Sequence, residues 1–199
     1  MKYRRVLGID PTSRGFGYII FEGKTPIDWG NTCSGDNREA AILERLTALE
    51  KRWSPDALII EDYHATGNKR CLRVKLLLAA VEKQVAAIEL PTFRISHWSL
   101  KRKFQKYGAR TKHQRAELVA SLFPVLHPRL PRKRKPWMSE ADRMSIFVAA
   151  GMVMTFLSAR KGFPDADWRR ASNLGGSSAT PETRPLGQPD TPDTNPRTR

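Results

Sequence analysis

The first hundred positions contain short apolar runs separated by turn residues, and this pattern predicts β-strands. Only short turns separate the three runs nearest the N-terminus, which is typical of an antiparallel meander. Two more apolar runs follow, each after a segment with helical periodicity. The sequence therefore predicts five strands, at residues 3–10, 15–22, 27–33, 57–61 and 92–96.

Other segments repeat their apolar residues about every 3.6 positions, as amphipathic helices do. The fourth of these segments starts with Thr111 and Gln114, which have the spacing of a capping box. Three hairpin strands followed by alternating helices and strands predict an α/β fold with a mixed sheet and helices on its faces. The predicted helices span residues 37–53, 69–89, 99–106, 111–123 and 139–161.

Proline and glycine mark the ends of the folded part. Residues 124–138 contain four prolines and are predicted to form a loop. From about residue 172 the chain is rich in Gly, Ser, Thr and Pro and lacks the apolar residues that would order it. We therefore expect one domain over residues 1–162 and a disordered tail over residues 172–199.

The composition excludes several classes of protein. Of the 199 residues, 40% are hydrophobic, which is enough for a core. The longest nearly apolar run, residues 146–157, is shorter than the roughly 20 residues that span a bilayer. The N-terminus shows no secretory signal, and Cys33 and Cys71 have no metal-ligand spacing. These features predict a soluble, cytoplasmic protein with free thiols and no membrane partner.

The net charge of +15 is concentrated in one segment. Residues 101–135 carry twelve Lys and Arg against a single acid, Glu117, which gives this segment a net charge of +11. Such a density of positive charge indicates a polyanionic partner, most simply a nucleic acid. The alternative is a solvated basic surface that includes a run of four cations at residues 132–135.

Three acids stand at the ends of apolar elements. Asp10 and Glu61 end predicted strands, and Asp142 lies in the first turn of the last predicted helix. A carboxylate in such a place is costly to bury unless it is paired or binds a cation. Oxygen ligands of this kind suit Mg²⁺, and two such ions can activate a water and stabilise the leaving oxygen of a phosphodiester.

Each acid also has a structural interpretation. Asp10 precedes a proline, so it could be a turn residue, and Glu61 could be a strand-end charge next to Asp62. Asp142 follows Ser139 by three residues, a spacing that fits helix capping. From the residues alone, both interpretations stay open.

The order of the motifs resembles that of the RuvC family of Holliday junction resolvases. The sequence DPTSR at residues 10–14, followed by Gly17 and Tyr18, resembles the family's GIDPGSR…GY motif. The sequence GARTKHQ at residues 108–114 resembles its GxGxAxK.QV segment, and ADRMSI at residues 141–146 resembles its ADALAI helix. Similar segments occur in the same order over roughly residues 4–158.

This resemblance implies an RNase H-like (RuvC-type) fold, in which a mixed five-stranded sheet carries helices on both faces. It also implies a homodimer that cleaves four-way (Holliday) DNA junctions by two-metal phosphodiester hydrolysis, with two Mg²⁺ ions and with Mn²⁺ able to substitute. By the same match, Asp10, Glu61 and Asp142 are catalytic metal ligands, and Lys112 is a catalytic cation that offsets transition-state charge.

The chain departs from the family pattern at two places near these acids. Ser139 stands where the family usually has a fourth acid, so we add Glu140 as a further candidate metal ligand. His64 stands where the family has an aromatic residue. Either Tyr63 or His64 could stack on a base, although Tyr63 could equally be a packing residue. The candidate nucleic-acid-binding residues are Ser13, Arg14, Tyr63, His64, Lys101, Arg110 and Lys112.

Two other functions are compatible with the sequence. The same fold could serve a nuclease that acts on RNA or on another branched DNA, as the altered region around Ser139 suggests. Alternatively, the basic helices could form a non-catalytic DNA-binding module, in which the acids play no part.

Overall fold

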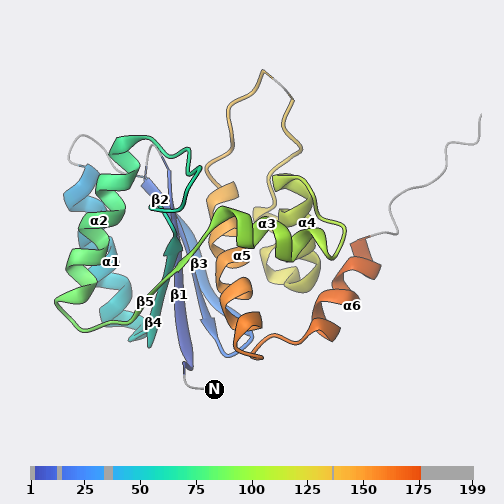
Figure 1. Cartoon of the computed structure of the whole chain (residues 1–199), viewed down its shortest axis with the longest axis horizontal. Coiled ribbons are helices and arrows are strands. Elements are labelled where there is room, and N and C mark those ends of the chain that lie inside the picture. The colour runs from blue at the N-terminus through green and yellow to red at the C-terminus, as the bar shows by residue number, and fades with distance from the viewer. Residues whose placement is uncertain (1–2, 13–14, 34–37, 136, 176–199) are drawn as a thin grey trace, which may run out of the picture.

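Figure 1 shows the computed structural model of the chain, which describes residues 3–12, 15–33, 38–135 and 137–175. A single sheet lies between two groups of helices. The elements, in chain order, are β1 (Arg5–Pro11), β2 (Gly15–Glu22), β3 (Thr25–Cys33), α1 (Arg38–Trp53), β4 (Ala57–Glu61), α2 (Leu72–Ala86), β5 (Thr92–Ile95), α3 (His97–Gln105), α4 (Lys112–Leu122), the 3₁₀ helix η1 (Pro124–Arg129), α5 (Met144–Ala159) and α6 (Asp165–Gly175).

The sheet is mixed and has the strand order β3-β2-β1-β4-β5. The first three strands pair antiparallel, as the predicted meander requires. β4 pairs in parallel with β1 on one side and with β5 on the other. Parallel neighbours need long crossover connections, which the helices between them provide. The prediction of five strands in a mixed sheet is confirmed.

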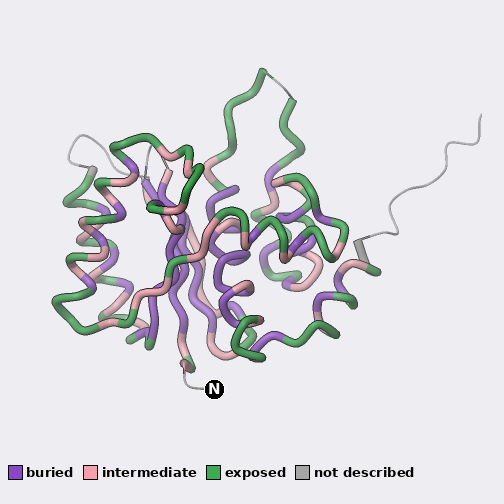
Figure 2. Tube along the Cα trace, viewed as in Figure 1, coloured by how far each residue is buried: buried purple, intermediate pink, exposed green. Residues whose placement is uncertain are grey.

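Both faces of the central strands are apolar, because successive side chains point to opposite faces. Leu7 and Ile60 belong to the buried cluster that contains residues of α1 and α2. Val6 and Ile59 belong to the other cluster, which contains residues of α3 to α6. Figure 1 shows these two groups of helices on opposite sides of the sheet, and Figure 2 shows that the central strands β1, β2 and β4 are buried between them. The prediction of helices on both faces is also confirmed.

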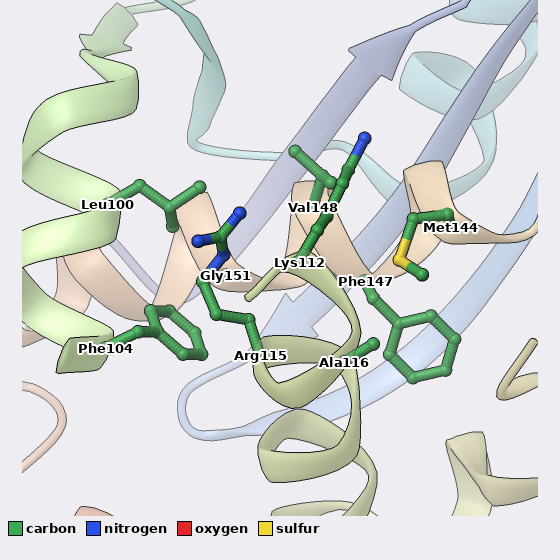
Figure 3. Close-up of a pocket in the computed structure, with 9 residues that line it drawn as sticks. All are labelled: Leu100, Phe104, Lys112, Arg115, Ala116, Met144, Phe147, Val148 and Gly151. Atoms are coloured by element: carbon green, nitrogen blue, oxygen red, sulfur yellow. The ribbon is translucent and has the colours of Figure 1, made fainter. Parts of the chain in front are cut away.

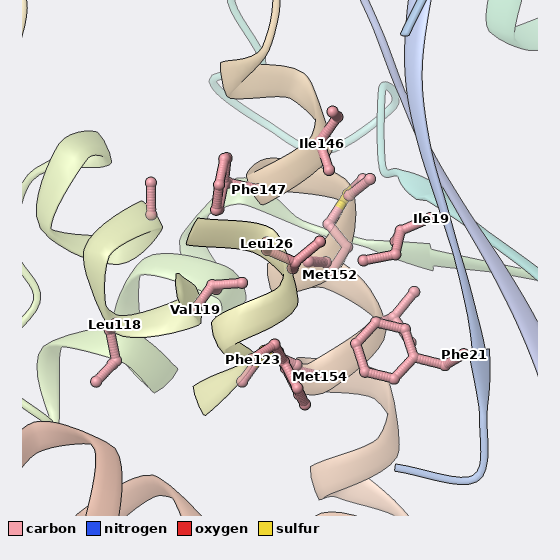
Figure 4. Close-up of a cluster of buried hydrophobic side chains, with 14 of the residues drawn as sticks. Ile19, Phe21, Leu118, Val119, Phe123, Leu126, Ile146, Phe147, Met152 and Met154 are labelled. Atoms are coloured by element: carbon pink, nitrogen blue, oxygen red, sulfur yellow. The ribbon is translucent and has the colours of Figure 1, made fainter. Parts of the chain in front are cut away.

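Helix α5 is the centre of the larger cluster, because it packs against the sheet, α3 and α4 (Figure 4). The cluster also includes aromatic contacts such as that of Phe21 with Phe123, whose ring centroids are 5.3 Å apart. Although α5 is strongly apolar, none of the described helices is both long enough and apolar enough to cross a membrane.

Three elements differ from the sequence prediction. α5 begins at Met144 and not at residue 139, and residues 124–129 form a 3₁₀ helix inside the predicted loop. Helix α6 was not predicted because its apolar face depends largely on one fully buried residue, Trp168, which stacks on Tyr107. α6 extends the packed structure beyond the predicted domain end at residue 162, while residues 176–199 of the predicted tail lie outside the described residues.

Candidate active site

Asp10 and Glu61 lie at the same edge of the sheet. β1 and β4 are parallel neighbours, and Gly8 pairs with Ile59 two residues before each acid. Ile59 faces α5, and side chains alternate along a strand, so Glu61 and Asp10 also point toward the α5 face. Only 1% of Asp10 and 7% of Glu61 is exposed. The fold therefore brings two buried carboxylates together at the carboxyl ends of two central strands.

The N-terminus of α5 lies against the strand next to Asp10. Gly17 pairs with Asp10 across the sheet, and a Cβ atom at Gly17 would lie 2.6 Å from the backbone nitrogen of Ile146. Only glycine permits this close approach. Asn31, the neighbour of Gly17 on β3, donates hydrogen bonds of 2.8 Å to the backbone oxygen of Asp142 and to Ser145 Oγ. The third predicted acid is thereby held at the same edge of the sheet as Asp10.

Arg70 joins the first two acids, and sequence reasoning missed this residue. Its Nε lies 2.6 Å from Glu61 Oε2, and its Nη2 donates a hydrogen bond to Asp10 Oδ1. Its Nη1 donates to the backbone oxygen of Pro11 at 3.0 Å. Asn68 donates to the second Glu61 oxygen at 3.1 Å and accepts from the backbone N–H of Arg70 at 2.9 Å. The loop after β4 thus places a guanidinium between the two carboxylates.

The carboxylate oxygens of Asp10 and Glu61 are chemically suited to bind a hard divalent cation. Buried carboxylate oxygens are typical Mg²⁺ ligands, and Asp10 and Glu61 already share one positive charge. Within the described ranges, no three Asp, Glu, His or Cys side chains are close enough together to hold a metal ion. Arg70 occupies the space between the two acids, so a cation that binds both must replace the guanidinium.

Burial controls the charge of this pair. It raises the pKa of Asp10 from 3.8 to about 6, and the positive charges of Arg70 and Lys112 only partly offset this effect. Burial alone would lower the pKa of Arg70, but the charges of Asp10 and Glu61 raise it overall. Positive charge beside Asp10 therefore favours the ionised form of this carboxyl.

A basic cleft of about 370 Å³ opens beside Glu61. Among its described lining residues, Glu61 is the only carboxylate, and Asn68 also lines the cleft. Burial, followed by the charges of neighbouring cations, lowers the pKa of His97, which also lines the cleft. The described residues that line it include five cations, Lys69, Arg70, Lys101, Lys112 and Arg115. An anionic ligand is therefore the chemistry that the cleft favours.

The start of α4 orients two of these cations. Thr111 and Gln114 form the predicted capping box, which fixes the first turn of the helix. Lys112 and Arg115 are three residues apart and therefore share one face of α4. Figure 3 shows both side chains extending from α4 toward α5. Lys112 Nζ also forms an ion pair of 2.6 Å with Glu140, which precedes α5 and is not in a helix.

The other predicted nucleic-acid-binding residues fall into three groups. Ser13 and Arg14 lie outside the described residues. Tyr63 is packed in the core, and its hydroxyl donates a hydrogen bond to Glu82. This burial is incompatible with the prediction that Tyr63 stacks on a base. The ring of the next residue, His64, is exposed. Arg110 is exposed just before α4.

Sequence comparison identifies the family. No family profile matches the chain. The chain is 32% identical over 129 residues to the crossover junction endodeoxyribonuclease RuvC of Geobacter sulfurreducens, and the match covers 59% of this chain and 78% of that protein. The chain belongs to the RuvC family. It is therefore an endonuclease, as the motifs at residues 10–18 and 108–114 predicted.

Solved structures confirm the RuvC-type, RNase H-like fold. Thermus thermophilus RuvC superposes with a TM-score of 0.57 at 20% identity, over 80% of this chain and 97% of that one. The same protein in complex with a Holliday junction substrate gives 0.56 at 18% identity, over 80% and 96%. The yeast mitochondrial Holliday junction resolvase Ydc2 gives 0.52 at 15% identity, over 89% and 82%.

Proposed function

We propose that this RuvC-family chain is a Mg²⁺-dependent, structure-specific endodeoxyribonuclease that cleaves four-way DNA junctions. The observation that carries the proposal is the pair of buried carboxylates, Asp10 and Glu61, beside a cleft lined by five cations. The relatives reported above, which include a resolvase and a complex with a Holliday junction, support the choice of substrate.

Asp10, Glu61 and Asp142 are the proposed metal ligands. When bound, two Mg²⁺ ions (or Mn²⁺ in their place) supply an activated water and stabilise the charge of the leaving oxygen. Glu140 is a weaker candidate because its carboxylate is paired with Lys112. Arg70 pairs with both Asp10 and Glu61, and its charge favours the ionised form of Asp10 until a cation replaces it.

Lys112 is the proposed catalytic cation. It is close enough to Asp10 to lower the pKa of that buried carboxyl, so its charge acts at the place where the scissile phosphate would bind. A fixed positive charge there stabilises the extra negative charge of the transition state. Lys101, on α3, lines the same cleft and is proposed to hold a neighbouring phosphate.

A homodimer is the proposed assembly, because paired cuts in a four-way junction require two active sites. Helix α2 has an apolar surface that this dimer could bury. Leu72 and Leu76 are one turn apart on α2, and they are 71% and 59% exposed. Exposed leucines at this spacing are typical of a helix that packs against a partner.

A matched pair of acid substitutions tests the proposed function. The parent protein should make paired nicks in a labelled mobile four-way junction with Mg²⁺. Glu61→Gln should reduce the single-turnover rate by at least about 10³-fold, whereas Asp62→Asn, a change of the adjacent acid, should leave it within about threefold. Full activity of Glu61→Gln would rule out the proposed site.

The same assay separates the alternative substrates. Linear duplex, flap and RNA substrates of matched length should be cut at least about tenfold more slowly than the junction. Faster cleavage of RNA or flaps would instead assign the chain to another nuclease activity of this fold. Tight binding of the junction without any cleavage would indicate a DNA-binding module.

A further inference from the structure

Arg115 is a buried cation whose charge no described acid neutralises. Only 7% of the residue is exposed, although it lines the basic cleft. Its hydrogen bond, from Nη1 to the backbone oxygen of Arg110, is long at 3.3 Å. Among the described residues, no carboxylate lies within ion-pair distance of its guanidinium. The other arginine of the cleft, Arg70, pairs with both Asp10 and Glu61.

Apolar residues surround the aliphatic part of the Arg115 side chain (its stem), and cations lie near its guanidinium. Leu100, Phe104 and Gly151 surround the stem, and Figure 3 shows the guanidinium beside Leu100. The charges of Lys101, Lys112 and Arg115 all lower the pKa of His97, after the larger effect of burial, so these cations face the same space. The one acid in the cleft, Glu61, is already bound by Arg70 and Asn68.

Burying a guanidinium without a counter-charge is unfavourable, because the ion loses its hydration and gains little in return. The apolar packing of the stem offsets part of this cost. An anion in the cleft would supply the missing partner. A guanidinium has a planar fork of donors that matches two oxygens of a phosphate, so this residue type is well suited to bind one.

We propose that Arg115 binds a backbone phosphate of the DNA strand that enters the basic cleft, next to the scissile phosphate proposed to bind beside Asp10 and Glu61. The inference rests on the proposed function and adds a residue that sequence reasoning did not select. Arg115 stands where the RuvC motif GxGxAxK.QV has valine, so the contact distinguishes this chain from that pattern. A purely structural role is the competing explanation.

Salt dependence of binding separates the two roles. Affinity for a fluorescent four-way junction and for a duplex of equal length would be measured in EDTA over a range of salt concentrations. Arg115→Met, which keeps the bulk of the side chain, should make the slope of log Kd against log salt shallower by about 0.9. Affinity at low salt should fall by at least about tenfold, and Arg115→Lys should restore the slope.

Arg160→Met is the matched control. Arg160 lies just after the C-terminus of α5, and its guanidinium packs 3.9 Å from the centroid of the Phe156 ring. Removing this arginine should leave the slope unchanged. A folded Arg115→Met protein, with a cooperative melting transition, that retains the parental slope would overturn the proposal.

The role of Arg115 can also be tested with the parent protein. If Arg115→Met does not fold, the parent is tested with junctions that carry single neutral methylphosphonate linkages near the cut. Loss of affinity at one linkage beyond the scissile one supports the contact, and its absence at every linkage contradicts it. A parent that never cuts junctions would refute the proposed function, but the slopes would still decide the role of Arg115.

Discussion

Two groups of cations lie close in sequence but differ in their physical setting. Lys101, Lys112 and Arg115 come from helices α3 and α4, which pack on α5, and they line the cleft beside Glu61. Residues 132–135, with the sequence RKRK, are all exposed in the segment between η1 and α5. Figure 1 shows this segment projecting away from the body of the protein.

The difference shows that net charge does not by itself locate a site. Exposed cations on a projecting segment attract DNA over a distance that salt limits to about 10 Å. Cations on a packed helix stay at fixed positions relative to the carboxylates, which is what stabilisation of a transition state requires. Lys112 should therefore control the rate of cleavage. Arg115 should contribute one phosphate contact to affinity, and residues 132–135 should contribute to salt-dependent affinity without affecting the rate.

Among these cations, removal of Lys112 should have the largest effect on the cleavage rate. This substitution tests whether the cleft cations have a catalytic role. Lys112→Met should lower the single-turnover cleavage rate by about 10²–10³-fold, the usual cost of losing one fixed charge donor in a catalytic site. Junction affinity should fall by less than about tenfold. Lys106→Met, at the exposed end of α3, is the control and should cleave at the parental rate. If Lys112→Met changes the cleavage rate by less than about threefold, then Lys112 has no catalytic role that residues 132–135 lack.

Neutralising residues 132–135 should have a smaller effect than Lys112→Met, and it should change only the affinity for the junction. Replacing all four cations with glutamine should reduce the salt slope by up to about 3.6, since each phosphate contact contributes about 0.9. As salt rises from 50 to 200 mM, the ratio of the parent's affinity to that of the variant should therefore fall by about 100-fold. Cleavage at saturating protein should keep its rate. A slower saturated rate with unchanged binding would reverse the proposed division of roles.

The sequence predicted the elements and residues that local patterns encode. Apolar alternation and turn residues marked every strand of the sheet, and the Thr111 capping box marked the start of α4. The positions of Asp10 and Glu61 at strand ends followed from the apolar runs that precede them. Such features depend on neighbouring residues, which a single sequence displays.

Features that depend on tertiary contacts were missed. Nothing in the local sequence distinguishes Arg70 from the other cations near it, since its role depends on a loop that returns to Pro11 and Asp10. Arg115 looked like one more charge in a basic segment, although α4 buries it. Helix α6 depends on the fit of Trp168 against Tyr107 and Phe104, which no periodicity reveals.

The pH dependence of stability should show the smallest effect. It tests the contrast because the acid Asp10 is buried beside the cleft, whereas residues 132–135 are exposed. Burial raises the pKa of Asp10 from 3.8 to about 6 in the folded protein. Between these values the folded state binds more protons at Asp10 than the unfolded state, so the contribution of Asp10 to stability falls as pH rises. At about 1.4 kcal/mol per pKa unit, the loss between pH 4 and 7 is at most about 3 kcal/mol.

Asp10→Asn removes this titration. Measured in EDTA, its free energy of unfolding should therefore rise relative to that of the parent as pH increases from about 4 to about 7. The glutamine-substituted variant of residues 132–135 serves as the control, and its difference from the parent should stay constant over the same range. A constant difference for Asp10→Asn would mean that the positive charge of Arg70 fully offsets the effect of burial on the pKa of Asp10.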